Sequence, residues 1–372
     1  MKPRERLLAA FHKEPCDAIP FAPLVEGYFQ ASHPDRATKD IVDIQYELTG
    51  HILVRTAVAR VNTPIYLGAF NVQNPPDGVT ERLYFEGEDI VHVTETPVGS
   101  LTWRLQYRPE SPYIPWIKKN RILTVEDIKT YQWLLERTKM TLALEPYLER
   151  VKYVGERGLV LAMGPPISPM QNMINLESGL ETFVYLLADY PDEMNEMLET
   201  AHAAQKESWK VHTEAPVEFF FVHDNLSSTT TSRPMYRRYD RRFTNDYADI
   251  LHAAGKKLIM HWCGRLTVFA DDFAESKIDG ISDVTPLPTG DTNIVEARKT
   301  WAKRWIVMGG IDPTLFARGT PEEVTAYVDD LLGRMTPGRR GFILGSGDAV
   351  PYGTPLENLK AAAAAAMRFS AD

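Results

Sequence analysis

Short apolar runs alternate with helix-like segments from Gly158 to the C-terminus, and this alternation constrains the fold more than any other feature. The apolar runs are GLVLAMG, VEFFFVHDN, KKLIMHWCG, DGISDVTP, RWIVMGGID and GFILGSGD. The helix-like segments between them span 179–212, 234–254, 266–277, 293–303, 320–335 and 355–370. The runs are brief, rich in Val, Ile, Leu and Phe, and not interleaved with polar residues, which is typical of parallel strands buried on both faces. Six β/α units are therefore predicted.

Two further strands are predicted ahead of these units. They are DAIPFAPLVEG (17–27) and GHILVRTAVAR (50–60), with a helical segment near 36–48 between them. Eight strand–helix repeats favour a closed (β/α)8 TIM barrel over an open doubly wound sheet, which usually carries a glycine-rich phosphate loop. Neither a G-x-G-x-x-G pattern nor a Walker A pattern follows any predicted strand. The fold class expected is therefore α/β, a TIM barrel.

The interval 61–157 does not fit the repeat. It contains the hairpin-like RLYFEGEDIVHVTETPVGSLTWRLQYRP, followed by the helical TVEDIKTYQWLL and ALEPYLERVKYVGER. We expect an insertion of a hairpin plus helices over the barrel mouth, within a single domain of residues 1–372. The aromatic residues of this insertion either shape an apolar pocket or pack the insertion itself: Tyr84, Phe85, Trp103 and Trp116.

The charge balance excludes some classes of partner. The formal net charge is −9 and the isoelectric point is about 5.6, so nucleic acid and anionic membranes would repel the chain. The basic stretch MYRRYDRRF (235–243) is interpreted as the solvated face of a helix. The N-terminus lacks the apolar core of a secretory signal, and no run approaches the roughly 18 apolar residues of a membrane span. A cytoplasmic protein is expected, and a homodimer is left open.

Polar residues gather at the predicted carboxyl ends of the strands, where barrels of this class build their active sites. In chain order they are Glu26, His223, Asp224, Asn225, His261, Cys263, Asp283, Asp312 and Asp348. Asp224 and Asn225 are expected to orient substrate, or to hold the second hydrogen of a metal ligand, or only to stabilise a turn. Asp312, in GGIDPT, is interpreted first as a turn or helix cap.

His261 and Cys263 are separated by one residue, so on an extended strand both side chains point to the same side. Zinc accepts both an imidazole and a thiolate, although the same pair could be a core histidine beside a buried thiol. Asp348, in ILGSGDAVPYGTP, is the best third ligand, since the glycines before it let the backbone turn sharply. Glu26 is expected as an auxiliary ligand or as a general acid/base. The other cysteine, Cys16, lies far away in sequence and is expected to be structural.

Several stretches together resemble the uroporphyrinogen decarboxylase superfamily. They are RERLLAAFHKEPCDAIPFAP, EFFFVHDNLSSTTTSRPMYRRY, AAGKKLIMHWCGRL, DGISDVTPLP, IVMGGIDPTLFARGTPEEV and GTPLENLKAAAAAA. The resemblance implies a (β/α)8 barrel. True decarboxylases of the superfamily carry an arginine-rich R-Q-A-G-R segment after the first strand, whereas this chain has PLVEGYFQASHP there. The sequence is therefore more similar to the branch of methyltransferases that work with corrinoid proteins.

In that branch the zinc site resembles H-x-C after the fifth strand plus a cysteine in a glycine-containing loop after the eighth. His261 and Cys263 match the first part, whereas Asp348 occupies or neighbours the position of the second cysteine. A carboxylate in place of a thiolate leaves the metal more electrophilic and favours polarising an ether oxygen.

The resemblance thus implies a zinc-dependent methyltransferase that moves a methyl group between a small methylated donor, such as a methyl ether, and a corrinoid protein. No cobalamin-binding D-x-H-x-x-G occurs in the chain, so the corrinoid (cobalamin) would arrive on a separate partner. Three alternatives stay open: a methylcobamide:thiol methyltransferase of the coenzyme M type, a metal-free decarboxylase-like enzyme, and a catalytically silent barrel that binds a corrinoid protein.

Overall fold

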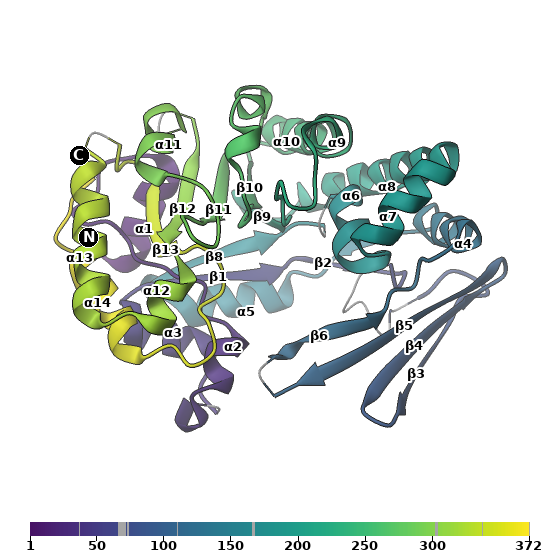
Figure 1. The fold of residues 1–372 in the computed structure, drawn as a ribbon, viewed down its shortest axis with the longest axis horizontal. Coiled ribbons are helices and arrows are strands. Elements are labelled where there is room, and N and C mark those ends of the chain that lie inside the picture. The colour runs from purple at the N-terminus through teal and green to yellow at the C-terminus, as the bar shows by residue number, and fades with distance from the viewer. Residues whose placement is uncertain are drawn as a thin grey trace.

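Parallel strands curl into a barrel-like sheet at the centre of the molecule (Figure 1). The computed structural model describes residues 1–36, 38–65, 72, 74–109, 111–165, 168–301, 304–336 and 338–371. Within these residues the sheet has seven strands in the order β1-β8-β9-β10-β11-β12-β13. Their bounds are β1 Ile52–Ala57, β8 Gly158–Met163, β9 Phe219–His223, β10 Lys257–His261, β11 Gly280–Val284, β12 Ile306–Ile311 and β13 Phe342–Ser346. The predicted α/β barrel class is confirmed.

The eighth strand position is occupied by an irregular segment. Phe21 forms a parallel bridge with Leu344, and Leu24 forms one with Ala349, but the predicted strand 17–27 has no regular ladder. Its two prolines, Pro20 and Pro23, have no N–H to donate, which explains the interruption.

A side chain closes the seam between this segment and β1. Gln45, buried in α3 (Ile41–Thr49), donates Nε2 to the carbonyl of Pro23 at 2.9 Å and accepts from the amide of Leu53 at 3.1 Å. The side-chain amide of Gln45 therefore joins the irregular segment to β1, at a place where the described residues form no backbone ladder.

Helices cover the outer face of the sheet. They include α5 Glu145–Val154, α8 Pro191–His212, α10 Arg242–Ala253, α11 Ile294–Trp301, α12 Pro313–Arg318, α13 Pro321–Arg334 and α14 Leu356–Ala366. Helix α7 (Leu180–Asp189) packs against α8. The helix-like segment 179–212 is divided at Pro191, which cannot continue the helix before it. The segment 266–277 holds two 3-10 turns, Thr267–Phe269 and Asp272–Glu275, where a helix was expected.

The buried carboxylate of Asp272 accounts for part of that difference. It binds Arg233 at 2.8 Å and Arg237 at 2.5 Å, and Arg241 lies 3.5 Å away, so long-range ion pairs hold the 266–277 segment. Within the basic stretch 235–243, Arg237 and Arg241 are paired in this way, and Tyr236, Tyr239 and Asp240 are buried. The stretch is helical, as interpreted, but only part of it is a solvated face.

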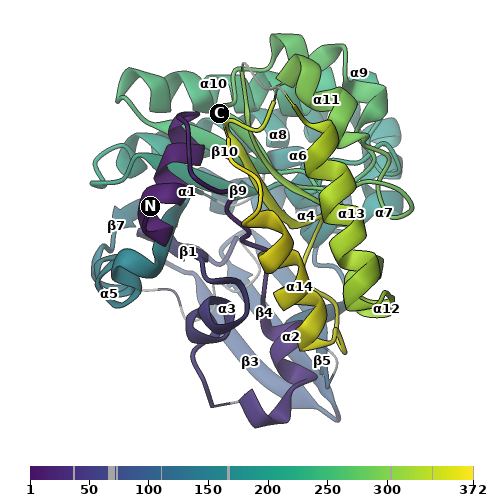
Figure 2. The ribbon, with the colours of Figure 1, turned by 90° about the vertical axis from the view of Figure 1, so that its left-hand side faces the viewer.

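Helix α1 (Pro3–His12) closes the amino-terminal end of the barrel. Leu7 and Phe11 are fully buried in one cluster with inward-facing strand residues such as Leu53, Phe219 and Ile259. Figure 2 shows α1 at the N-terminus. Buried Cys16 pairs with Ala371 through two backbone hydrogen bonds, which supports its structural interpretation.

The insertion leaves the barrel after β1. It contains β2 Ala59–Val61, which pairs with β7 Met140–Leu142, and an antiparallel sheet of β3 Thr80–Glu86, β4 Asp89–Thr96, β5 Gly99–Arg108 and β6 Ser111–Lys119. Helix α4 (Val125–Leu135) packs against β5 and α8, and β6 contacts α2 (Gly27–Ala31) beside the barrel mouth. Residues 66–71, 73 and 110 of the predicted insertion lie outside the described residues, and the single-domain division 1–372 stays a prediction.

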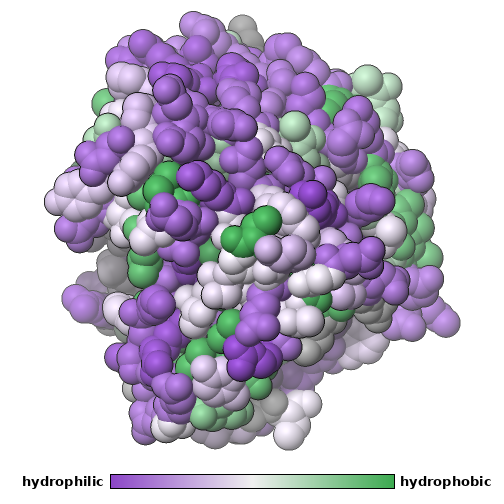
Figure 3. Space-filling view, turned by 90° about the vertical axis from the view of Figure 1, so that its right-hand side faces the viewer, coloured by the Kyte–Doolittle hydropathy of each residue, from purple (hydrophilic) through white to green (hydrophobic). Residues whose placement is uncertain are grey.

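The aromatic residues of the insertion divide into two groups. Trp103 is fully buried and helps to pack the insertion, whereas Phe85 and Trp116 are more than half exposed. On the face drawn in Figure 3, apolar side chains lie as separate spots among hydrophilic ones. Among the described residues, none of the helices combines the length and the apolar character that crossing a membrane requires.

Candidate functional site

The inward-facing residues of the strands change from apolar to polar towards the carboxyl ends. Side chains two residues apart share a face of a strand, so Leu53 is followed on the inside by Arg55, Phe221 by His223, and Ile259 by His261. The first member of each pair belongs to the apolar barrel interior, and the second lies one layer nearer to the mouth. The period of the strands therefore delivers these cationic or titratable side chains to one region.

The three predicted metal ligands come together there. One ligand atom each from His261, Cys263 and Asp348 lies within 4.8 Å of the others. His261 is buried at the end of β10, whereas Cys263 and Asp348 are half-buried in the loops that follow β10 and β13. Among the described residues, no other group of three or more His, Cys, Asp or Glu side chains lies close enough together to hold a metal ion.

Asp283 holds the other side of the His261 ring. Its Oδ2 lies 2.7 Å from Nδ1 of His261 and also accepts from the Ser282 hydroxyl at 2.6 Å. Burial alone would raise the pKa of Asp283, but His261 and Arg55 outweigh it and hold that pKa well below its usual range. A carboxylate on Nδ1 leaves Nε2 of the imidazole as the ligating nitrogen, an arrangement common in metal sites.

The strand is distorted to place Asp283. The pairing of β11 with β12 shifts register between Ile281 and Val284, and Asp283 has a φ of 60°. A left-handed conformation is uncommon for a residue other than glycine and often marks a functional position. The irregularity breaks the period-two alternation and turns the carboxylate towards His261. Sequence reasoning placed Asp283 at a strand end but gave it no role.

Each ligand loop is in close contact with a neighbouring loop, and Thr285 touches both. A side chain at Gly264 would collide with Ser227 and with the carbonyl of Leu226, and one at Gly347 would collide with Thr285. Neither glycine has a left-handed φ, but the backbone bends at Gly347 and Asp348, as the sequence led us to expect. The close approach of Thr285 explains why position 347 is a glycine. The Thr285 hydroxyl lies within hydrogen-bond reach of the carbonyls of Cys263 and Gly347, one in each loop.

The other predicted site residues take different places. Asn225 contacts the cluster, because its Oδ1 lies 3.8 Å from the sulfur of Cys263. Asp224 is fully buried and accepts from the Ser168 hydroxyl at 2.7 Å and from the indole N–H of Trp262 at 3.1 Å. It therefore anchors the residue between the two ligands and does not reach the cluster itself.

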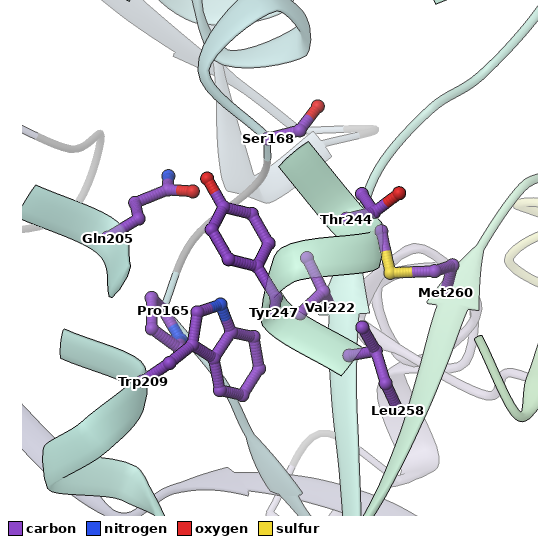
Figure 4. Close-up of a pocket in the computed structure, with 9 residues that line it drawn as sticks. All are labelled: Pro165, Ser168, Gln205, Trp209, Val222, Thr244, Tyr247, Leu258 and Met260. Carbon is purple, nitrogen blue, oxygen red and sulfur yellow. The ribbon is translucent and has the colours of Figure 1, made fainter. Parts of the chain in front are cut away.

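The surroundings of this anchor are tightly packed. Between the strands and helices α8 and α10 lies a cavity of only about 10 Å³, lined by Ser168, Trp209, Tyr247 and others (Figure 4). That volume is near the minimum for one water molecule, so the side chains around Ser168, the partner of Asp224, are tightly packed.

Asp312 is a helix cap, as interpreted from the sequence. Its Oδ1 accepts from the amide of Thr314 at 2.8 Å at the start of α12, and its Oδ2 accepts from the amide of Thr289.

A cavity of about 380 Å³ lies near the cluster: none of the three ligands lines it, but its lining residue His223 has its ring centre 5.4 Å from that of His261. Glu26, Arg55 and His223 line it together with apolar side chains, among them Leu24, Val25, Val42, Leu53, Val54 and Met163. Burial raises the pKa of Glu26, although the positive charge of Arg55 opposes the shift. Burial also lowers the pKa of His223 to about 3, so its imidazole is neutral at pH 7.

Sequence reasoning missed Arg55 altogether. The residue is the single charge in the apolar run HILVRTAV, and its even spacing from Leu53 is the signal that could have placed it inside the barrel.

Comparisons with known proteins identify a family and a protein of similar fold. Residues 100–369, well over half of the chain, match the family described as uroporphyrinogen decarboxylase (URO-D). A solved methyltransferase from Methanosarcina mazei is similar in fold, with a TM-score of 0.59, 14% identity and 99% coverage of both chains. A family 5 xyloglucanase from Paenibacillus pabuli has a TM-score of 0.35 and 12% identity, and that match covers 60% of this chain and 80% of the xyloglucanase chain. No curated protein sequence matches the chain.

Proposed function

The chain belongs to the uroporphyrinogen decarboxylase family, and on that premise we propose that it is a zinc-dependent methyltransferase acting with a separate corrinoid protein. The cluster of His261, Cys263 and Asp348 beside the 380 Å³ cavity is the observation that carries the proposal. The similarity in fold to a methyltransferase supports the proposed reaction class.

The donor set fits zinc. Tetrahedral zinc holds nitrogen, sulfur and oxygen ligands about 3.3 to 3.8 Å from one another, and small side-chain shifts bring atoms that lie within 4.8 Å into that range. Three protein ligands leave a fourth position for substrate, as catalytic zinc sites require. The contact of Asp283 with Nδ1 of His261 supplies the usual outer support.

The proposed direction is removal of a methyl group from a donor such as a methyl ether. Zinc bound to one imidazole, one thiolate and one carboxylate would supply Lewis acidity towards the ether oxygen. The carbon–oxygen bond breaks as the methyl passes to the corrinoid, and the departing oxygen takes up a proton. Glu26 lines the same cavity, and burial raises its pKa, so its carboxyl group is the proposed proton donor.

Metal content tests the proposal first. We expect about one zinc per chain in protein purified without a histidine tag, and loss of that zinc in Cys263→Ser and Asp348→Ala. Cys16→Ser is the matched control, since Cys16 is buried at the chain termini and donates to the carbonyl of Ala18. Mass spectrometry of the metal gives the readout.

Absence of metal in the wild type, even after zinc is added back, would refute the zinc site. Methyl transfer from a methyl ether to a corrinoid protein would then be measured on the metal-loaded protein. Binding of the corrinoid protein without any transfer would refute the catalytic part of the proposal.

A further inference from the structure

Arg55 places a guanidinium group in the centre of the barrel. The residue lies on β1, its side chain is 9% exposed, and its Cζ lies 4.1 Å from the centre of the Phe221 ring. Its nearest charged partner is Asp283 on β11, which belongs to a strand four positions away in the sheet. The side chain therefore extends into the barrel interior towards the metal-ligand cluster.

Among the described residues, Arg55 has one hydrogen-bond partner, Asp283. A guanidinium has five N–H donors, and the contact from Arg55 Nη2 to Asp283 Oδ2 is long, at 3.4 Å. The buried Nε has no hydrogen-bond partner among the described residues. Leaving a charged donor buried and unsatisfied is costly, so a ligand that completes these hydrogen bonds would gain affinity.

A second arginine lines the cavity but has a partner of its own. Arg150 directs Nη1 to both oxygens of Asp40, at 2.9 and 2.8 Å. Asp283, in turn, is already engaged with His261 and Ser282. Among the described cavity-lining cations, Arg150 thus has its charge paired closely with Asp40, whereas Arg55 has only the long contact with a carboxylate that other groups already engage.

We propose that Arg55 anchors a carboxylate of the substrate, so that the protein acts on methylated compounds that combine an apolar body with an anionic group. The planar guanidinium matches a carboxylate through two parallel hydrogen bonds. The inward-facing apolar side chains of the cavity, such as Leu53 and Met163, would contact the body of the substrate. The carboxylate site is inferred from Arg55 alone. Only the statement that the ligand carries a methyl group rests on the proposed function.

Calorimetric titration with matched ligands tests the inference without any methyl transfer. The probes are 4-methoxybenzoate and its neutral analogue 4-methoxybenzamide. We expect the wild type to bind the carboxylate at least about tenfold more tightly, because hydrogen bonds to a charged group are stronger than those to a neutral amide. Arg55→Met should abolish that preference and leave amide binding nearly unchanged.

Two further variants separate charge from geometry. Arg55→Lys keeps the charge but loses the planar fork, so an intermediate preference is expected. Arg157→Met is the control, because Arg157 pairs with Asp43 and does not line the cavity. Circular dichroism checks that each variant is folded. If Arg55→Met does not fold, the difference in affinity of the wild type for the two probes tests the inference.

Equal affinity of the wild type for the two probes, or binding of neither, would overturn the inference. An equal loss for both probes in Arg55→Met would also overturn it, as would a preference that Arg150→Met abolishes and Arg55→Met leaves intact. Preferential binding without methyl transfer would refute only the proposed function, whereas transfer from neutral ethers alone would refute only this inference.

Discussion

The carboxylate of Asp283 holds Nδ1 of His261 while its own backbone adopts a left-handed φ of 60°. The same carboxylate accepts from Ser282 and faces Arg55 across the barrel. One residue thus links the proposed metal ligand to the proposed anion anchor. We expect substitution of Asp283 to lower metal affinity more than it lowers the stability of the fold.

Asp283→Asn should weaken zinc binding by about 10- to 100-fold, the usual effect of removing an outer carboxylate. Asparagine tolerates the left-handed conformation and keeps an oxygen for the His261 hydrogen bond, so the change isolates the charge. Competition with a chromogenic chelator measures the affinity. Asp330→Asn, at an exposed ion pair with Arg334, is the control. Unchanged zinc affinity in Asp283→Asn would contradict the assigned role.

At the scale of elements, the barrel closes through a helix side chain. Gln45 of α3 joins Pro23 of the irregular first segment to Leu53 of β1. This substitute for a backbone ladder is needed because prolines interrupt the first segment. The carboxyl ends of both segments carry residues of the cavity, Glu26 and Arg55, so the seam bears directly on the site.

Gln45→Met should lower the free energy of unfolding by about 1 to 3 kcal/mol, because it leaves the buried amide of Leu53 without its side-chain partner. The carbonyl of Pro23 retains the amide of Val25, which limits the loss. Urea unfolding followed by circular dichroism measures the change. Gln132→Met, at a surface contact with Glu196, should cost less than about 0.5 kcal/mol. A similar small effect at Gln45 would show that the seam contributes no stability.

For the whole molecule, buried histidines link stability to pH. Burial lowers the pKa of His51 and of His212 to about 4. The unfolded chain takes up these protons near pH 6.5, whereas the folded chain does so only near pH 4. The contribution of these histidines to the free energy of unfolding is therefore fully present above pH 6.5, and it is lost as the pH falls from 6.5 to 4.

His212→Gln should flatten this pH dependence. His212 ends α8 and is 2% exposed, so its contribution between pH 7 and pH 4.5 is about 2 to 3 kcal/mol. Urea unfolding of both proteins at several pH values measures the difference in slope, which does not depend on the cost of the substitution at pH 7. Parallel curves for the two proteins would refute the assignment.

The insertion is tied to the barrel helices by a buried ion pair. Arg121, which follows β6, binds Glu177 at 2.5 and 2.9 Å, and both side chains are nearly inaccessible to solvent. Arg121 also lies over the ring of Trp103 at 3.9 Å. The hairpin-like pattern of the sequence predicted antiparallel strands here, but nothing in the local pattern indicated which residues would anchor them.

The sequence by itself determined the β/α repeat, the barrel class and the set of His261, Cys263 and Asp348. Period-two and period-3.6 patterns are local, and parallel strands in a barrel all bring their carboxyl ends to one mouth, so local patterns suffice for these features. Only the tertiary structure decided the roles of Asp283, Arg55, Asp224 and Gln45. Their partners lie on elements distant in the chain, and the register shift that turns Asp283 inward depends on how β11 packs between its neighbours.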